Sequence, residues 1–129
     1  MGFRVVRPEE LEWITRPHEP DEAPRHVAEA SYVARFAHSR GNFWRYEPGA
    51  KGRRHRHPIQ EETFVVLSGT LSMYVGDPPE RHDVPAGALI HIEPGTEIQT
   101  ANHGDADLVL YAYGTPPEDE HAEILDSAL

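Results

Sequence analysis

Two apolar runs joined by a very short connection restrict the fold of this chain more than any other feature. Residues 62–67 and 70–75 are rich in apolar and β-branched side chains, and only Ser68-Gly69 lies between them. Such runs are typical of β-strands, and a two-residue connection that contains glycine is typical of a tight turn. The sequence therefore predicts two consecutive strands here, followed by a second turn at Gly76-Asp-Pro-Pro79.

Short strand-like segments separated by turn residues continue along most of the chain. The 129 residues include 12 prolines and ten glycines, too many for a helical bundle. Further short strands are expected at residues 42–46, 88–92, 97–101 and 108–113, while 32–36 fits either a strand or a helix. We predict an all-β fold, an antiparallel sandwich or barrel in a single domain.

The two ends of the chain differ in composition from this central region. Residues 1–25 form a charged, proline-rich N-terminal arm, with a short strand expected at Phe3–Val6 and a helix start at Pro8. Trp13 and Ile14 are expected to dock onto the main body or onto a second subunit. The barrel is assigned to residues 26–115, and residues 116–129 to a tail or short amphipathic helix.

Charge and composition exclude several classes of function. The chain has 22 Asp and Glu against 12 Lys and Arg, a formal net charge of −10, which repels nucleic acid and anionic lipid. It has no cysteine for a disulfide or a thiolate zinc site. No apolar run approaches a membrane span, and the first residues do not resemble a signal peptide. We expect a cytoplasmic protein that binds a small molecule.

A His-x-His pair followed by a carboxylate is the strongest chemical signal. His55 and His57 are two residues apart, so an extended strand directs both imidazoles to one face, and Glu62 begins the next apolar run. Two imidazoles and one carboxylate are a ligand set for a divalent transition metal with open coordination positions. An exposed pair of histidines in a basic loop is the alternative, and Glu62 could instead form a salt bridge, for example with Arg45.

The spacing of these residues resembles the first sequence motif of the cupins. That motif has glycine, five residues, His-x-His, four residues, glutamate, six residues and glycine, and it is matched here by Gly49, His55, His57, Glu62 and Gly69. The resemblance covers roughly residues 40–114. It implies a jelly-roll barrel that often forms homodimers and binds iron, manganese, nickel or zinc. It does not specify a reaction, because cupins include oxygenases, isomerases, decarboxylases and sugar-binding domains.

The second cupin motif is matched with one exception. Gly87, Pro94, Gly95 and Asn102 fall at the expected positions, but Ile98 stands where the motif has a histidine ligand. One interpretation is a metal site of three ligands, assisted by Gln99 or His103, although Gln99 should face the other way unless a bulge redirects it. The other is a metal-free, non-catalytic binding or sensing module with an apolar pocket floor.

Further residues are candidates for ligand contact. We expect a small molecule to meet Arg45, Tyr46, Phe64, Ile98 and Gln99. The aromatic residues Trp44, Tyr111 and Tyr113 fit the core or the barrel mouth, and His91 alternates with isoleucines and fits an outward face. No catalytic acid or base is assigned. A homodimer is expected, because a second subunit could cover the arm and the exposed sheet edges.

Overall fold

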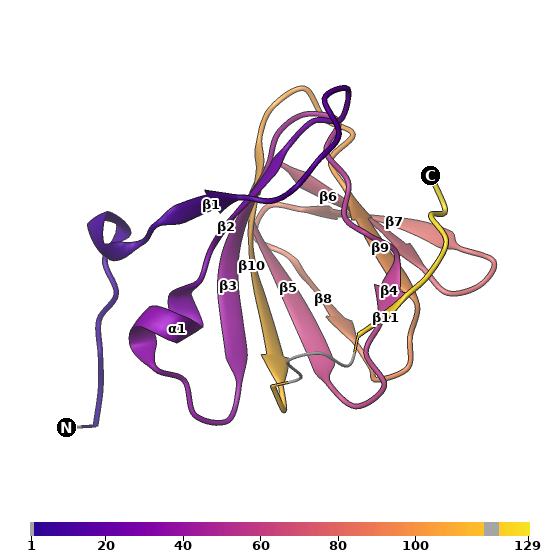
Figure 1. The fold of residues 1–129 in the computed structure, drawn as a ribbon. Helices are drawn as coiled ribbons and strands as arrows, with labels where there is room; N and C mark the ends of the chain where they lie inside the picture. The colour runs from indigo at the N-terminus through magenta and orange to yellow at the C-terminus, as the bar shows by residue number, and fades with distance from the viewer. Residues whose placement is uncertain (1, 118–121) are drawn as a thin grey trace.

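The computed structural model describes residues 2–117 and 122–129. Its strands form two antiparallel sheets that face each other (Figure 1). The first has the order β1 (Trp13–Thr15), β2 (Arg25–Ala28), β3 (Arg40–Tyr46), β10 (Leu108–Thr115), β5 (Glu61–Ser68) and β8 (Leu89–Ile92). The second has the order β11 (Glu123–Ile124), β4 (His55–Arg56), β9 (Ile98–Ala101), β6 (Thr70–Val75) and β7 (Glu80–Pro85).

The expected tight turn exists, but it joins strands of different sheets. β5 pairs with β10 and β8, whereas β6 pairs with β7 and β9. Gly69 carries the chain from one sheet to the other with φ +79°, a conformation that favours glycine. A Cβ atom at this position would lie 2.7 Å from the backbone oxygen of Asp107, so the crossing also requires a residue without a side chain.

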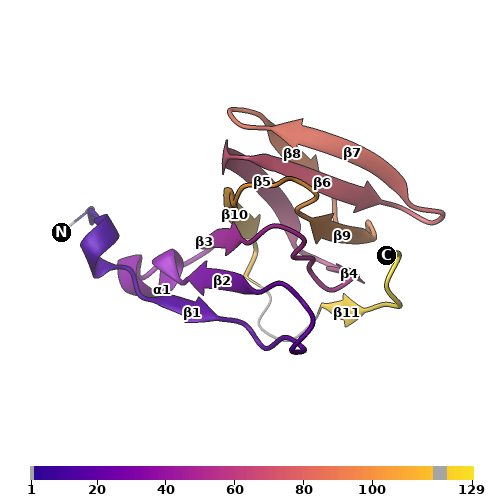
Figure 2. The same cartoon turned by 90° about the horizontal axis from the view of Figure 1, so that it is seen from above.

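The N-terminal arm and the helix lie to one side of the barrel. β1 and β2 extend the first sheet away from the second one, and the helix α1 (Ala30–Ala34) packs beside β3 (Figure 2). The ambiguous segment 32–36 is therefore partly helical. No strand forms at Phe3–Val6, and the helix expected from Pro8 is a single 3-10 turn, η1 (Pro8–Glu10).

The C-terminal part of the chain returns to the barrel. The described residues 122–129 contain β11 and no helix, and the expected helix otherwise falls on 118–121, outside the described residues. β11 pairs with β4, where Glu123 is opposite Arg56 and Ile124 is opposite His55. The tail therefore lies against the strand that carries the first histidine.

The hydrophobic core lies between the two sheets. Along β10, Leu108, Leu110 and Ala112 are buried, while Tyr113 is 40% exposed. Leu71 and Met73 of β6 are fully buried and belong to the same cluster of core side chains. This alternation is the period of two expected for strands with one face covered. None of the described helices is long and apolar enough to cross a membrane.

Candidate metal centre

The two histidines and the glutamate lie together in the barrel. One potential ligand atom from each of His55, His57 and Glu62 falls within 4.8 Å of the other two. Nε2 of His57 is 3.6 Å from Oε1 of Glu62, and the exposed fractions of these side chains are 9% and 12%. β4 and the residues after it supply the imidazoles, and β5 in the opposite sheet supplies the carboxylate. The site therefore spans the two sheets.

The backbone selects the tautomer of His55. Its Nδ1 lies 2.8 Å from the carbonyl oxygen of Arg53 and donates to it, so Nε2 carries the lone pair. Burial lowers the pKa of His55, and the positive charges of Arg25 and Arg40 act in the same direction, against the bond to Arg53. The neutral imidazole, which is the form that binds metals, is therefore favoured.

The distances between these atoms fit a first-row divalent ion. With metal–ligand distances of about 2.0–2.2 Å, neighbouring ligand atoms lie roughly 3–3.6 Å apart. The separation of 3.6 Å between His57 and Glu62 is already in this range, and the upper limit of 4.8 Å for the group requires a modest rotation of side chains. Two imidazoles and a carboxylate suit iron, manganese, nickel or zinc.

The position of the missing fourth ligand is filled by a core residue. Ile98 is opposite His55 in the register of β4 and β9, is 1% exposed and packs in the core. Gln99 faces the other way, as expected: its Nε2 donates to the carbonyl oxygen of Gly52 at 3.0 Å. His103 is exposed and pairs through Nε2 with the hydroxyl of Tyr74 at 2.8 Å. Neither residue lines the cavity that contains His55, His57 and Glu62.

That cavity, called here the metal cavity, has a volume of about 310 Å³. Its walls combine aromatic, polar and basic side chains. They include Trp44, Tyr46, Phe64, Asn42, Thr100, Arg16, Arg25, Arg40 and Arg53. The buried Oδ1 of Asn42 has no hydrogen-bond partner among the described residues, so it is an acceptor available to a bound molecule. The hydroxyl of Tyr46 pairs with Oγ1 of Thr100 at 2.7 Å.

The residues expected to contact a ligand separate into two groups. Tyr46 and Phe64 line the metal cavity, whereas Arg45, Ile98 and Gln99 do not. Adjacent residues of a strand face opposite sides, so Arg45 and Tyr46 cannot both point inward. Arg45 instead pairs with Asp107 at 3.3 Å and lies over the ring of Trp13, which also rules out the suggested salt bridge to Glu62.

Several residues of the cavity wall were not predicted from the sequence. Trp44 was expected in the core or at the barrel mouth, and Asn42 was not considered. Asn42 and Trp44 precede Tyr46 by four and two positions, so the strand period could have assigned both to the same wall. No comparable signal exists for Arg16 and Arg25. They come from the arm, and only the folded chain brings them to the cavity.

Several solved structures share this fold. A sugar phosphate isomerase of the cupin superfamily from Silicibacter pomeroyi is 22% identical, with a TM-score of 0.76 over 88% of this chain and 76% of that one. A predicted oxalate decarboxylase from Thermotoga maritima is 17% identical, with a TM-score of 0.75 over 88% and 100%. A polyketide cyclase from Streptomyces resistomycificus is 14% identical, with a TM-score of 0.78 over 96% and 86%.

Sequence comparison agrees with the structural similarity. No curated protein sequence is significantly similar to this chain. The model of the cupin domain family, however, matches residues 42–114, which is more than half of the chain and runs from within β3 to within β10. With the jelly-roll arrangement of the sheets and the cluster of two histidines and a glutamate, the chain belongs to the cupin family.

Proposed function

We propose that this protein holds a divalent transition metal with His55, His57 and Glu62 and acts on a small, oxygen-rich molecule in the metal cavity. The convergence of the three ligand atoms within 4.8 Å, in a partly buried site, carries the proposal. Two imidazoles and a carboxylate that converge in this way are a donor set that fits a divalent transition metal.

The surrounding residues would bind and orient the molecule. A divalent ion at this site supplies Lewis acidity toward an oxygen atom of the ligand. Asn42 offers its buried Oδ1 to a hydroxyl group, and Trp44, Tyr46 and Phe64 provide apolar walls that exclude water. Of the three proteins of similar fold, one is a sugar phosphate isomerase, one is a predicted oxalate decarboxylase and one is a polyketide cyclase. The molecules in these names are rich in oxygen, which supports the same class of ligand for this chain.

Metal analysis of the purified protein tests this proposal. We expect a substantial fraction of an equivalent of iron, manganese, nickel or zinc, and a loss of at least about tenfold in metal affinity after H55A/H57A. His91→Ala is the matched control, because His91 is an exposed histidine on β8 that bonds to Thr63. Less than about a tenth of an equivalent, unchanged by adding any of the four metals, would reject the proposal.

A metal-free binding or sensing module is the second candidate, and Ile98 favours it. This residue contributes no donor atom and extends the core beside His55. A metal-free module predicts that H55A/H57A leaves small-molecule binding unchanged. The metal-dependent proposal predicts instead that the double variant loses that binding together with the metal.

A further inference from the structure

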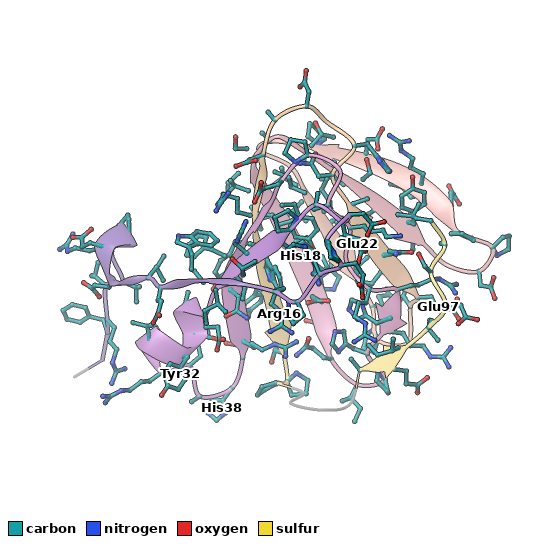
Figure 3. The ribbon with its side chains drawn as sticks, turned by 45° about the horizontal axis from the view of Figure 1, so that its top comes forward. Arg16, His18, Glu22, Tyr32, His38 and Glu97 are labelled. Carbon is teal, nitrogen blue, oxygen red and sulfur yellow. The ribbon has the colours of Figure 1, made fainter. Side chains whose placement is uncertain are left out.

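Three arginines lie where the metal cavity meets a larger neighbouring cavity. The larger one has a volume of about 550 Å³, and both cavities are lined by Arg16, Arg25 and Arg53, together with Gly52 and Ile124. Arg16 belongs to the connection between β1 and β2, which Figure 3 shows with Arg16, His18 and Glu22 labelled along it. We call these three arginines the arginine wall.

The arginine wall has no carboxylate partner in the part of the chain that the structure describes. Other arginines are paired: Arg54 and Arg56 bind Glu97, Arg45 binds Asp107, and Arg81 binds Asp83. No carboxylate oxygen of the described residues lies within 4.0 Å of the side chains of Arg16, Arg25 or Arg53. In a chain with a net charge of −10, three unneutralised guanidinium groups beside one cavity point to an anionic ligand.

Arg25 is the best positioned of the three. Its Cζ lies 5.0 Å from the ring centroid of Trp44 and 5.5 Å from that of Tyr46. Stacking on aromatic faces fixes the guanidinium plane and leaves its N–H groups free to bind in that plane. A planar fork of donors matches the oxygen atoms of a carboxylate or a phosphate, which it binds through two parallel hydrogen bonds.

Gly52 lies close to Thr100 and to the guanidinium of Arg25. A Cβ atom on Gly52 would clash with Oγ1 of Thr100 and would lie 3.5 Å from Nη1 of Arg25. Position 52 therefore has no room for a side chain between these two residues. Glu19, Glu22, Lys51 and Arg54 also line the larger cavity, so only the arginine wall, which both cavities share, is assigned to the anion.

We propose that the small molecule bound in the metal cavity carries an oxyanion, a carboxylate or a phosphate, which binds to the arginine wall formed by Arg16, Arg25 and Arg53. This inference rests on the proposed function, because it names the class of molecule that occupies the same cavity. The oxyanion binds at the wall that the two cavities share, and the rest of the molecule extends toward His55, His57 and Glu62.

Calorimetric titration of the purified protein with matched probes, with and without added divalent metal, tests the proposal. Ribose 5-phosphate and oxalate carry the two candidate oxyanions, and ribose and oxamide are their neutral counterparts. We expect at least one anionic probe to bind ten or more times as tightly as its neutral counterpart. A preference for ribose 5-phosphate would identify a phosphate site. A preference for oxalate that persists without metal would identify a carboxylate site, because oxalate also chelates divalent metals directly. Equal binding of each anion and its neutral counterpart would overturn the proposal.

Variants identify the residues responsible. R16Q/R53Q changes two exposed side chains, retains the Arg53 carbonyl that holds His55, and should weaken binding of the anion at least tenfold. R81Q is the control, because it removes an arginine of β7 that is already paired with Asp83. R25K keeps the charge but loses the planar fork, and it should also weaken binding. Unchanged affinity in both R16Q/R53Q and R25K would overturn the proposal.

The same titrations separate this inference from the proposed function. If the purified protein takes up no metal but still prefers an anion in a manner that depends on R16Q/R53Q, the arginine wall stands and the metal-dependent function fails. If metal binds through His55, His57 and Glu62 but neither anion is preferred, the proposed metal site stands and the arginine wall is rejected. Metal content is measured on every variant before titration, so each result belongs to one outcome.

Discussion

His55 on β4 and Ile98 on β9 are cross-strand partners in the second sheet. Opposite positions of an antiparallel pair place their Cβ atoms about 4.5–5.5 Å apart, close enough for two side chains to share a ligand. In this chain the position opposite the histidine is apolar and 1% exposed. The cluster of potential ligands among the described residues is therefore limited to two imidazoles and one carboxylate.

Restoring a donor at this position should strengthen metal binding. We expect I98H to raise the affinity for zinc at least tenfold in a competition with a chelator, because a third imidazole would lie opposite His55. Burying a polar ring in the core should lower the free energy of unfolding of the metal-free protein by about 1–3 kcal/mol. I98L, which conserves volume without a donor, is the control. Equal zinc affinities of I98H and I98L would show that position 98 is not directed at the site.

Glu62 should matter for metal binding where its neighbour does not. E62Q replaces a carboxylate at 3.6 Å from His57 with a weaker neutral ligand, and we expect metal affinity to fall about 10–100-fold. Glu61 faces the other side of β5 and is 50% exposed beside His91. E61Q should therefore bind metal like the unmodified protein. Inductively coupled plasma analysis after dialysis checks both variants, and an equal loss in both would argue against Glu62 as a ligand.

The crossing between the sheets should depend on glycine at position 69. G69A adds a Cβ atom 2.7 Å from the backbone oxygen of Asp107 and imposes φ +79° on a residue that disfavours it. We expect a loss of about 2–4 kcal/mol in the free energy of unfolding, measured by urea denaturation. G95A has a similar φ of +82° but no neighbour within 4 Å. It should lose only about 1 kcal/mol. Equal losses would show that the clash contributes nothing.

We propose that the chain forms a homodimer through β1, an edge strand of the six-stranded sheet. Trp13 and Ile14 on this strand are 42% and 43% exposed, and an exposed apolar edge is readily covered by a second subunit. Light scattering should give the mass of a dimer for the unmodified protein and of a monomer for I14K. Y32K on α1, where Tyr32 is 82% exposed, should remain a dimer. A monomeric mass for the unmodified protein would reject the proposal.

Local patterns in the sequence predicted strands better than they predicted strand partners. The apolar runs at 62–67 and 70–75 became β5 and β6, with boundaries shifted by at most one residue. The turn between them says nothing of the sheet to which each belongs, because pairing is decided by contacts with distant strands such as β10 and β9. β2 and β7 were not expected, because the first begins with Arg25 and His26 and the second is largely charged. An extended strand was expected at His55 and His57, and β4 forms there with only two residues.

In the candidate site, too, local patterns were predicted from the sequence and contacts between distant residues were not. The spacing of His55, His57 and Glu62 was sufficient to predict that they lie together, because it matches a family motif. That prediction needed no knowledge of contacts between distant strands. Arg25 could not be found in this way. Its role depends on stacking over Trp44, which lies 19 residues later on a neighbouring strand. The assignment of Arg45 to the ligand site conflicted with strand alternation, a check that the sequence itself allowed.

The placement of the ligands on opposite sheets has a mechanical consequence. His55 lies on β4 of one sheet and His57 directly after it, whereas Glu62 lies on β5 of the other, so an ion held between them would link the two sheets. Anything that binds the folded chain and not the unfolded one raises its resistance to unfolding. In this protein, an ion held by the three side chains should therefore raise the melting temperature, and a melting curve would report on metal loading.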